Sequence, residues 1–218
     1  MRLTVAVSIA LIVLTLLAVP AGATMQYYTS QSDWAAATSG VFVIDFSEVV
    51  VPSSPGYVDY SITGVQLQDV TFTANPATDE FYVVDSAFGP DGYRSSFAPG
   101  NYLRGSTWQT RYFQAALPLN VNAVAMLVLT DNRGGKVTFS FSNGDSKEVQ
   151  TLNSATPYFV GFTFDQSVEW VKVDSDQNFT ALDNFAYGEA ATPEAGTILL
   201  GGIGLAALWA ARRLRRFC

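Results

Sequence analysis

Short hydrophobic runs separated by turn-forming clusters occupy most of the chain between residues 24 and 192. From Lys136 to Phe141 every second residue is apolar, which is the period of a strand with one buried face. Asn143 and Gly144 follow shortly after, and this pair supplies the positive φ angles of a tight hairpin turn. This part of the chain therefore predicts a β-hairpin.

The same reasoning predicts nine strands and an all-β fold. We expect no long amphipathic helix, only one or two helical turns between Ser32 and Thr38. Nine strands suit a jelly roll, a two-sheet antiparallel β-sandwich whose long crossovers would absorb an irregular stretch from Ser86 to Thr110. The predicted strands are Val41–Phe46, Val65–Thr73, Phe81–Asp85, Ala123–Thr130, Lys136–Phe141, Lys147–Leu152, Tyr158–Phe164, Val168–Val173 and Leu182–Tyr187.

The first 23 residues have the composition of a secretory signal peptide, and we expect them to form an N-terminal signal helix. Arg2 precedes a largely apolar stretch from Leu3 to Val19, and Ala21 and Ala23 form a small-residue cleavage pattern. We expect signal peptidase to cleave after Ala23. A non-cleaved N-terminal anchor is the alternative.

The C-terminal end has three parts in order: a motif at 193–195, an apolar run at 197–211 and a basic tail at 212–218. The apolar run is short for a span, which takes roughly 20 residues, so we expect a tilted or transient transmembrane helix. Arginines after the run should stay cytoplasmic and leave the preceding domain outside. These arginines are Arg212, Arg213, Arg215 and Arg216.

Pro193, Glu194 and Ala195, followed by the apolar run and the arginines, resemble the PEP-CTERM sorting signal of bacterial exosortase substrates. Ala195 stands where that family usually has a second proline. The resemblance implies processing near the motif by an exosortase-type membrane enzyme. It also implies a location in the envelope, on the surface or in the extracellular matrix of a Gram-negative-type bacterium. A plain membrane anchor is the alternative.

On this reading the chain divides into a signal peptide (1–23), a β-sandwich domain (24–190) and the sorting signal (191–218). Between residues 24 and 192 seven Lys or Arg face eighteen Asp or Glu, a net charge of about −11. Such a domain repels phosphate backbones, which argues against nucleic-acid binding. The chain has no histidine, and its only cysteine is the final residue, Cys218. Histidine-dependent nucleophile sets and the usual catalytic zinc sites are thereby excluded.

Short motifs in the central domain resemble the jelly-roll domains that commonly precede this sorting signal, which look like galactose-binding-type and carbohydrate-binding modules. The motifs are Val43–Phe46, Gly64–Phe72, Phe159–Phe162 and Ala181–Gly188.

The resemblance implies a structural calcium between the first and last strands, with Asp45, Glu48 and Asp183 as its carboxylate ligands. Calcium takes six to eight oxygen ligands and needs neither histidine nor cysteine. Ordinary acidic residues at strand ends are the alternative.

Aromatic side chains, interleaved with arginines and with backbone-breaking Gly and Pro, gather between residues 88 and 113. Sugars stack on Tyr and Trp, and long structured loops are where such sites usually lie. We therefore select Tyr93, Tyr102, Arg104 and Trp108 as candidate glycan-binding residues. Packing of these aromatics under the loop, as a satellite core, is the alternative.

Three classes of function stay open. The first is a non-catalytic surface or matrix protein that binds polysaccharide or other envelope polymers. The second is a secreted glycoside hydrolase or lyase, because paired carboxylates suffice for sugar hydrolysis, although no pair stands out in the sequence. The third is ice or surface adhesion, for which the scattered threonines at 71, 73, 107 and 110 form no regular face.

Overall fold

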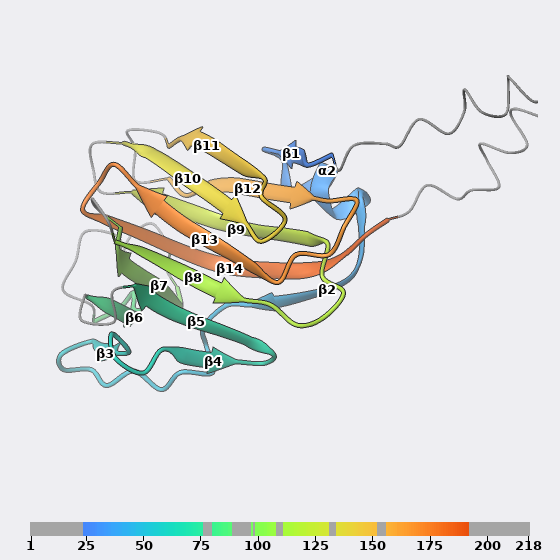
Figure 1. Ribbon diagram of the computed structural model, residues 1–218. Helices are drawn as coiled ribbons and strands as arrows, with labels where there is room; N and C mark the ends of the chain where they lie inside the picture. The colour runs from blue at the N-terminus through green and yellow to red at the C-terminus, as the bar shows by residue number, and fades with distance from the viewer. Residues whose placement is uncertain are drawn as a thin grey trace, which may run out of the picture.

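Strands make up most of the described part of the chain. The computed structural model describes residues 24–75, 80–88, 97, 99–107, 111–130, 134–151 and 156–191. They form two antiparallel sheets that pack face to face (Figure 1). The all-β prediction is therefore confirmed.

Within the described residues the larger sheet has eight strands and the smaller has six. In spatial order the larger sheet contains β1 (Gln26–Tyr28), β12 (Tyr158–Thr163), β9 (Ala123–Thr130), β14 (Phe179–Ala190), β7 (Asn101–Ser106), β6 (Phe81–Asp85) and β3 (Tyr57–Asp59), and β2 (Thr38–Ile44) pairs with β14. The smaller sheet contains β11 (Ser146–Gln150), β10 (Lys136–Phe141), β13 (Trp170–Ser175), β8 (Tyr112–Ala116), β5 (Val70–Asn75) and β4 (Val65–Leu67).

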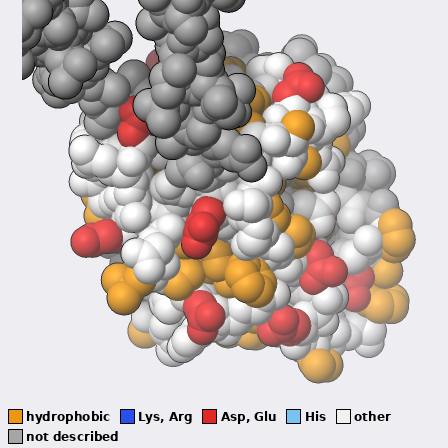
Figure 2. Space-filling view, turned by 90° about the vertical axis from the view of Figure 1, so that its right-hand side faces the viewer, with side chains coloured by type: hydrophobic (Ala, Val, Ile, Leu, Met, Phe, Trp, Pro, Cys, Tyr) orange, Lys and Arg blue, Asp and Glu red, His pale blue; other side chains and the backbone are white. Residues whose placement is uncertain are grey.

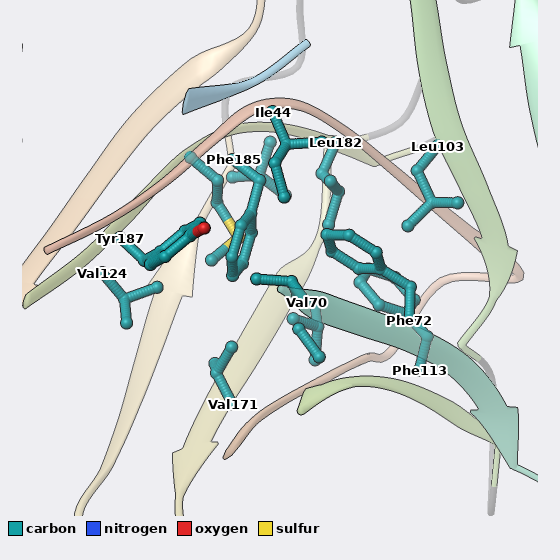
Figure 3. Packing of buried hydrophobic residues seen from close by; sticks show 14 of the residues in the cluster. Ile44, Val70, Phe72, Leu103, Phe113, Val124, Val171, Leu182, Phe185 and Tyr187 are labelled. Atoms are coloured by element: carbon teal, nitrogen blue, oxygen red, sulfur yellow. The ribbon is translucent and has the colours of Figure 1, made fainter. Parts of the chain in front are cut away.

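The main core lies between the two sheets and is rich in phenylalanine. Phe72 of β5 meets Phe185 of β14 edge to face, with ring centres 5.1 Å apart (Figure 3). Phe139 of β10 packs on Phe162 of β12 at 5.3 Å. Both contacts join one sheet to the other, as expected when every second residue of each strand points inward.

β14 is the longest strand and holds the larger sheet together. β9 runs along one side of it, while the other side pairs first with β7 and then with β2. The ladder with β9 is irregular between Asp183 and Ala186, and Asn184 has a φ of 49°. This bulge lies where β14 changes partner from β7 to β2, which is the kind of place where bulges re-aim side chains.

Several predicted strands have the predicted bounds, and others need correction. Phe81–Asp85, Ala123–Thr130 and Lys136–Phe141 are confirmed to the residue. Val65–Thr73 is two strands, because Gln68 takes a positive φ of 50° in a tight turn.

The stretch from Ser86 to Thr110 is not irregular throughout, since it contains β7. β1, β3 and β8 are strands that the sequence pattern does not predict. The first two have three residues each, too short to show a periodic pattern.

One short helix, α2 (Gln31–Ala36), confirms the helical turns expected near Ser32. Its first turn is capped by Ser30, whose hydroxyl oxygen accepts a hydrogen bond from the Asp33 N–H at 3.3 Å. The signal peptide and the sorting signal lie outside the described residues. Within the described ranges, no helix has the length and hydrophobicity that a membrane span requires.

Candidate functional site

The outer face of the larger sheet carries apolar side chains that do not belong to the main core. One group surrounds Trp34 of α2 and includes Ala123, Ala125 and Ala186. A second group surrounds Tyr102 of β7. The outer face is therefore partly covered, and the uncovered remainder is where a ligand would reach the sheet.

Trp34 closes one side of this face and is held in one position. Its indole N–H donates a hydrogen bond to the carbonyl of Phe162 at 3.1 Å, and only 3% of the residue is exposed. Gly161 lies directly beneath the indole, where a Cβ would come within 2.6 Å of Trp34 Cδ1. The absence of a side chain at Gly161 thus lets the helix approach the sheet.

A pocket of about 290 Å³ opens beside Trp34. α2, β2, β9, β12 and β14 contribute its lining, which consists of Gln31, Trp34, Ala35, Val41, Val43, Leu127, Phe159, Asn184 and Ala186. The described lining contains two primary amides and no charged group, and the rest is aliphatic or aromatic. Such a composition, apolar walls with a few polar groups, is typical of small-molecule sites.

The bulge in β14 brings Asn184 to this pocket. Asn184 is exposed, whereas Leu182, two residues before it, and Phe185, directly after it, belong to the main core. Its φ of 49° is one that Asn adopts more readily than most residues. Local backbone geometry therefore places an amide in the pocket wall.

Asp183, one of the predicted calcium ligands, lies next to Asn184 and is almost completely buried, with 9% exposure. Burial raises the pKa of its carboxyl to about 7; the Asn184 N–H, which donates to Oδ1 at 2.6 Å, opposes the rise, and the charge of Asp45 adds to it. Asp45 itself is exposed. The Ser47 hydroxyl and N–H both donate to Asp45 Oδ1, and they lower the pKa of that carboxyl.

The predicted calcium ligands are only partly brought together. Asp45 and Asp183 are close enough for their charges to interact, but Glu48 does not complete a group with them. Over the described residues, no three His, Cys, Asp or Glu side chains are arranged to hold a metal ion. The carbonyls of Phe46 and Val49 both accept hydrogen bonds from the Asn101 amide, at 3.1 and 2.8 Å.

A full calcium shell of six to eight oxygens is therefore not assembled from these side chains. The calcium site stays a prediction that rests on the carboxylates of Asp45 and Asp183.

Two of the four predicted glycan-binding residues are described, and both lie on the outer face. Tyr102 is fully buried and stacks on Phe97 with ring centres 5.0 Å apart, so it acts in packing and offers no free ring face. The Arg104 guanidinium lies over the ring of Phe179, 3.8 Å from its centre. Tyr93 and Trp108 lie outside the described residues, so their glycan-binding role stays a prediction.

The sequence did not nominate the pocket residues Gln31, Trp34, Phe159 and Asn184. They belong to three separate local patterns: Gln31 and Trp34 to a short helix, Phe159 to a strand, and Asn184 to an apparently regular last strand. The bulge at Asn184 has no local sequence pattern, because it lies where β14 changes partner from β7 to β2. Only the pairing of the strands and the packing of α2 on the sheet bring these residues together.

A second hollow, of about 190 Å³, lies at the end of the sandwich where β2 and β14 pair. Phe42 of β2 stacks on Tyr187 there, with ring centres 5.5 Å apart and planes 21° from parallel. Leu119 lines the hollow beside them, and Asp69 and Glu189 contribute carboxylates. Figure 2 views the side on which β2 lies, and the described residues visible there are hydrophobic side chains bordered by Asp and Glu, with no described Lys or Arg in view.

No protein-family model and no curated protein matches this chain. Among solved structures, the chain is similar to the CBM22-1 and GH10 modules of Clostridium thermocellum endo-1,4-β-D-xylanase 10B complexed with xylohexaose, at a TM-score of 0.39 and 7% identity. That match covers 68% of this chain and 28% of the xylanase chain, so this chain spans less than a third of the xylanase chain's length.

It is also similar to the K2 cleaved adhesin domain of Lys-gingipain, at a TM-score of 0.37 and 12% identity, covering 68% of this chain and 99% of that one. TmCBM61 in complex with β-1,4-galactotriose matches at a TM-score of 0.35 and 14% identity, covering 60% of this chain and 94% of that one.

Proposed function

We propose that the protein is an exported, non-catalytic surface or matrix protein whose jelly-roll domain binds polysaccharide through the outer face of its larger sheet. The observation that carries the proposal is the pocket beside Trp34. It combines the partly exposed ring of Phe159, supported by the edge of the buried Trp34, with the amides of Gln31 and Asn184. Aromatic surface and hydrogen-bonding amides are the two features that a sugar needs, one for its C–H faces and one for its hydroxyls.

The charge of the domain agrees with a polysaccharide partner and disagrees with nucleic acid. With a net charge of about −11 between residues 24 and 192, the domain repels phosphate backbones and tolerates uncharged polymers. The pocket itself has no charged group in its described lining, so its binding is largely insensitive to salt.

Binding is better supported than hydrolysis. A glycoside hydrolase needs two carboxyl groups facing each other across the sugar, at roughly 5 to 10 Å. Asp45 and Asp183 are neighbours with pKa values displaced in opposite directions, but neither lines the pocket. Asp183 is also buried. Surface adhesion gains no support from Thr107, which is fully buried.

Export is supported by the sequence at both ends. Signal peptidase would remove residues 1–23, and an exosortase-type enzyme would process the chain near Pro193, Glu194 and Ala195 while the apolar run crosses the membrane. Intact mass of the protein recovered from an exosortase-containing host tests the second step. A C-terminus near the motif supports it, and a mature chain that retains Cys218 contradicts it.

A glycan array with the full chain in mild detergent tests the binding function, in millimolar calcium and again with chelator. Ala35 is exposed at the pocket wall, so Ala35→Trp fills the pocket from its rim without disturbing the core. Gln166→Ala, at an exposed site outside the pocket, is the control. We expect binding by wild type and control, and loss in Ala35→Trp. Sugar release during the incubation would contradict the non-catalytic assignment.

A further inference from the structure

The pocket beside Trp34 has a chemical character more specific than sugar binding in general. Its polar groups in the described lining are two side-chain amides, from Gln31 and Asn184. A primary amide offers both a donor and an acceptor, so the two together can satisfy a neutral group that also has one of each. The rest of the wall is hydrocarbon or aromatic.

This composition disfavours two kinds of sugar. A uronic acid or sulfated sugar would lose hydration against apolar walls with no cation to compensate it, because the described lining contains neither Lys nor Arg. A plain hexose surrounded by hydroxyls would leave some of them without hydrogen-bond partners against Val41, Leu127 and Ala186, and unsatisfied hydroxyls weaken binding.

An acetamido group suits both the apolar wall and the two amides. Its methyl group is apolar, and its N–H and carbonyl are one donor and one acceptor. Building on the polysaccharide-binding function proposed above, we propose that the pocket binds the acetamido group of an N-acetylhexosamine residue. The methyl group lies against the apolar wall, and the amides of Gln31 and Asn184 pair with the N–H and carbonyl of the acetamido group.

The pocket is formed before the ligand arrives. Trp34 is held by its hydrogen bond to Phe162, and α2 is capped by Ser30. A rigid wall lowers the entropic cost of binding. The pocket is also accessible, because Val41 and Val43 are 39% and 49% exposed. A single sugar residue of a surface polymer can therefore enter without movement of the backbone.

The test compares two trisaccharides that differ only in the group at issue. Chitotriose and cellotriose share the same β-1,4 linkage, but chitotriose carries an acetamido group at each C2 position, where cellotriose has a hydroxyl. Isothermal titration with the full chain in mild detergent measures both. We expect chitotriose to bind at least tenfold more tightly, and saturation-transfer NMR to place its methyl protons closest to the protein.

Variants assign the preference to the pocket. Asn184→Gly removes one amide while keeping a residue that tolerates the positive φ, and Gln31→Ala removes the other at an exposed position. Each should weaken chitotriose binding severalfold and leave cellotriose unchanged. Ala35→Trp should abolish the preference. Gln166→Ala is the matched amide control and should bind chitotriose like the wild type.

The outcomes separate this inference from the proposed function. Equal affinity for the two trisaccharides overturns the acetamido assignment and leaves polysaccharide binding standing. Preferential chitotriose binding that survives all three pocket variants also overturns the assignment to this pocket. Binding of other glycans on the array, without binding of chitotriose, also overturns the acetamido assignment. If no glycan binds at all, the proposed function itself falls.

Discussion

Gly161 of β12 lies so close beneath Trp34 of α2 that a Cβ at Gly161 would come within 2.6 Å of Trp34 Cδ1 and 2.8 Å of Cγ. The indole cannot withdraw freely, because its N–H is bonded to the Phe162 carbonyl. Gly161→Ala should therefore displace α2 and destabilise the domain by roughly 1 to 3 kcal/mol, as overpacking does. Chemical unfolding followed by tryptophan fluorescence measures the change.

The same substitution in a Trp34→Leu variant shows whether the indole causes the loss of stability. In Trp34→Leu the flat ring is gone, so adding Gly161→Ala should cost clearly less than it does in the wild type. If Gly161→Ala has the same cost in both backgrounds, the clash with Trp34 is not responsible.

The buried carboxyl of Asp183 should make stability depend on pH in an identifiable way. Burial raises its pKa from 3.8 to about 7, so the folded state holds the proton more tightly than the unfolded chain. This stabilising contribution is complete below pH 4 and is lost as the pH rises through 7. Relative to Asp183→Asn, the wild type should lose roughly 2 to 4 kcal/mol of unfolding free energy over that range.

Urea unfolding of both proteins at a series of pH values gives this difference. Asp165 is present in both, and its pKa is lowered by Thr24, so its opposite pH dependence cancels. A difference between wild type and Asp183→Asn that does not change with pH would show that folding leaves the pKa of Asp183 unshifted and would contradict the prediction.

Calcium binding at Asp45 and Asp183 is tested by thermal unfolding. If both carboxylates hold calcium, the ion at 100 times its dissociation constant should stabilise the fold by about 2.7 kcal/mol and raise the melting temperature. The effect should be larger at pH 8 than at pH 6, because Asp183 must release its proton first. Asp183→Asn should remove it. Identical melting curves with calcium and with chelator at pH 8 would contradict calcium binding at this site.

β2 should be a site of self-association. It has no charged residue from Thr38 to Ile44, three successive side chains at 41–43 are 39% to 58% exposed, and its only described pairing is with β14. Uncharged apolar edge strands of this kind tend to pair with other chains. Phe42→Lys should therefore reduce light scattering on heating, whereas Ile62→Lys, at an exposed apolar residue outside any strand, should not.

Signal-peptide cleavage predicts a mature N-terminus at Thr24. N-terminal sequencing of protein exported from a bacterial host checks this directly. Ala23→Phe places a bulky residue at the cleavage position and should leave the full-length precursor in the membrane. A wild-type protein that keeps Met1 would indicate a non-cleaved anchor instead.

Where structure depends on neighbours in the sequence, the sequence predicted it. The hairpin of β10 and β11 is confirmed because alternating side chains and a turn sequence are both local features. The expected pair of positive φ angles is wrong in one residue, since Gly144 has a φ of 92° and Asn143 does not take a positive φ. The split between β4 and β5 was missed because Gln68 takes a positive φ, which is uncommon for glutamine.

The sequence by itself determined the all-β composition, the acidic charge and the exclusion of histidine chemistry, because these follow from residue types and short-range periodicity. Only the tertiary structure decided where a ligand can bind. The pocket takes residues from Gln31 to Ala186, and they meet because β2, β9, β12 and β14 pair in one sheet while Gly161 lets Trp34 approach. Strand order and a bulge at Asn184 are set by contacts between distant segments, which no local pattern records.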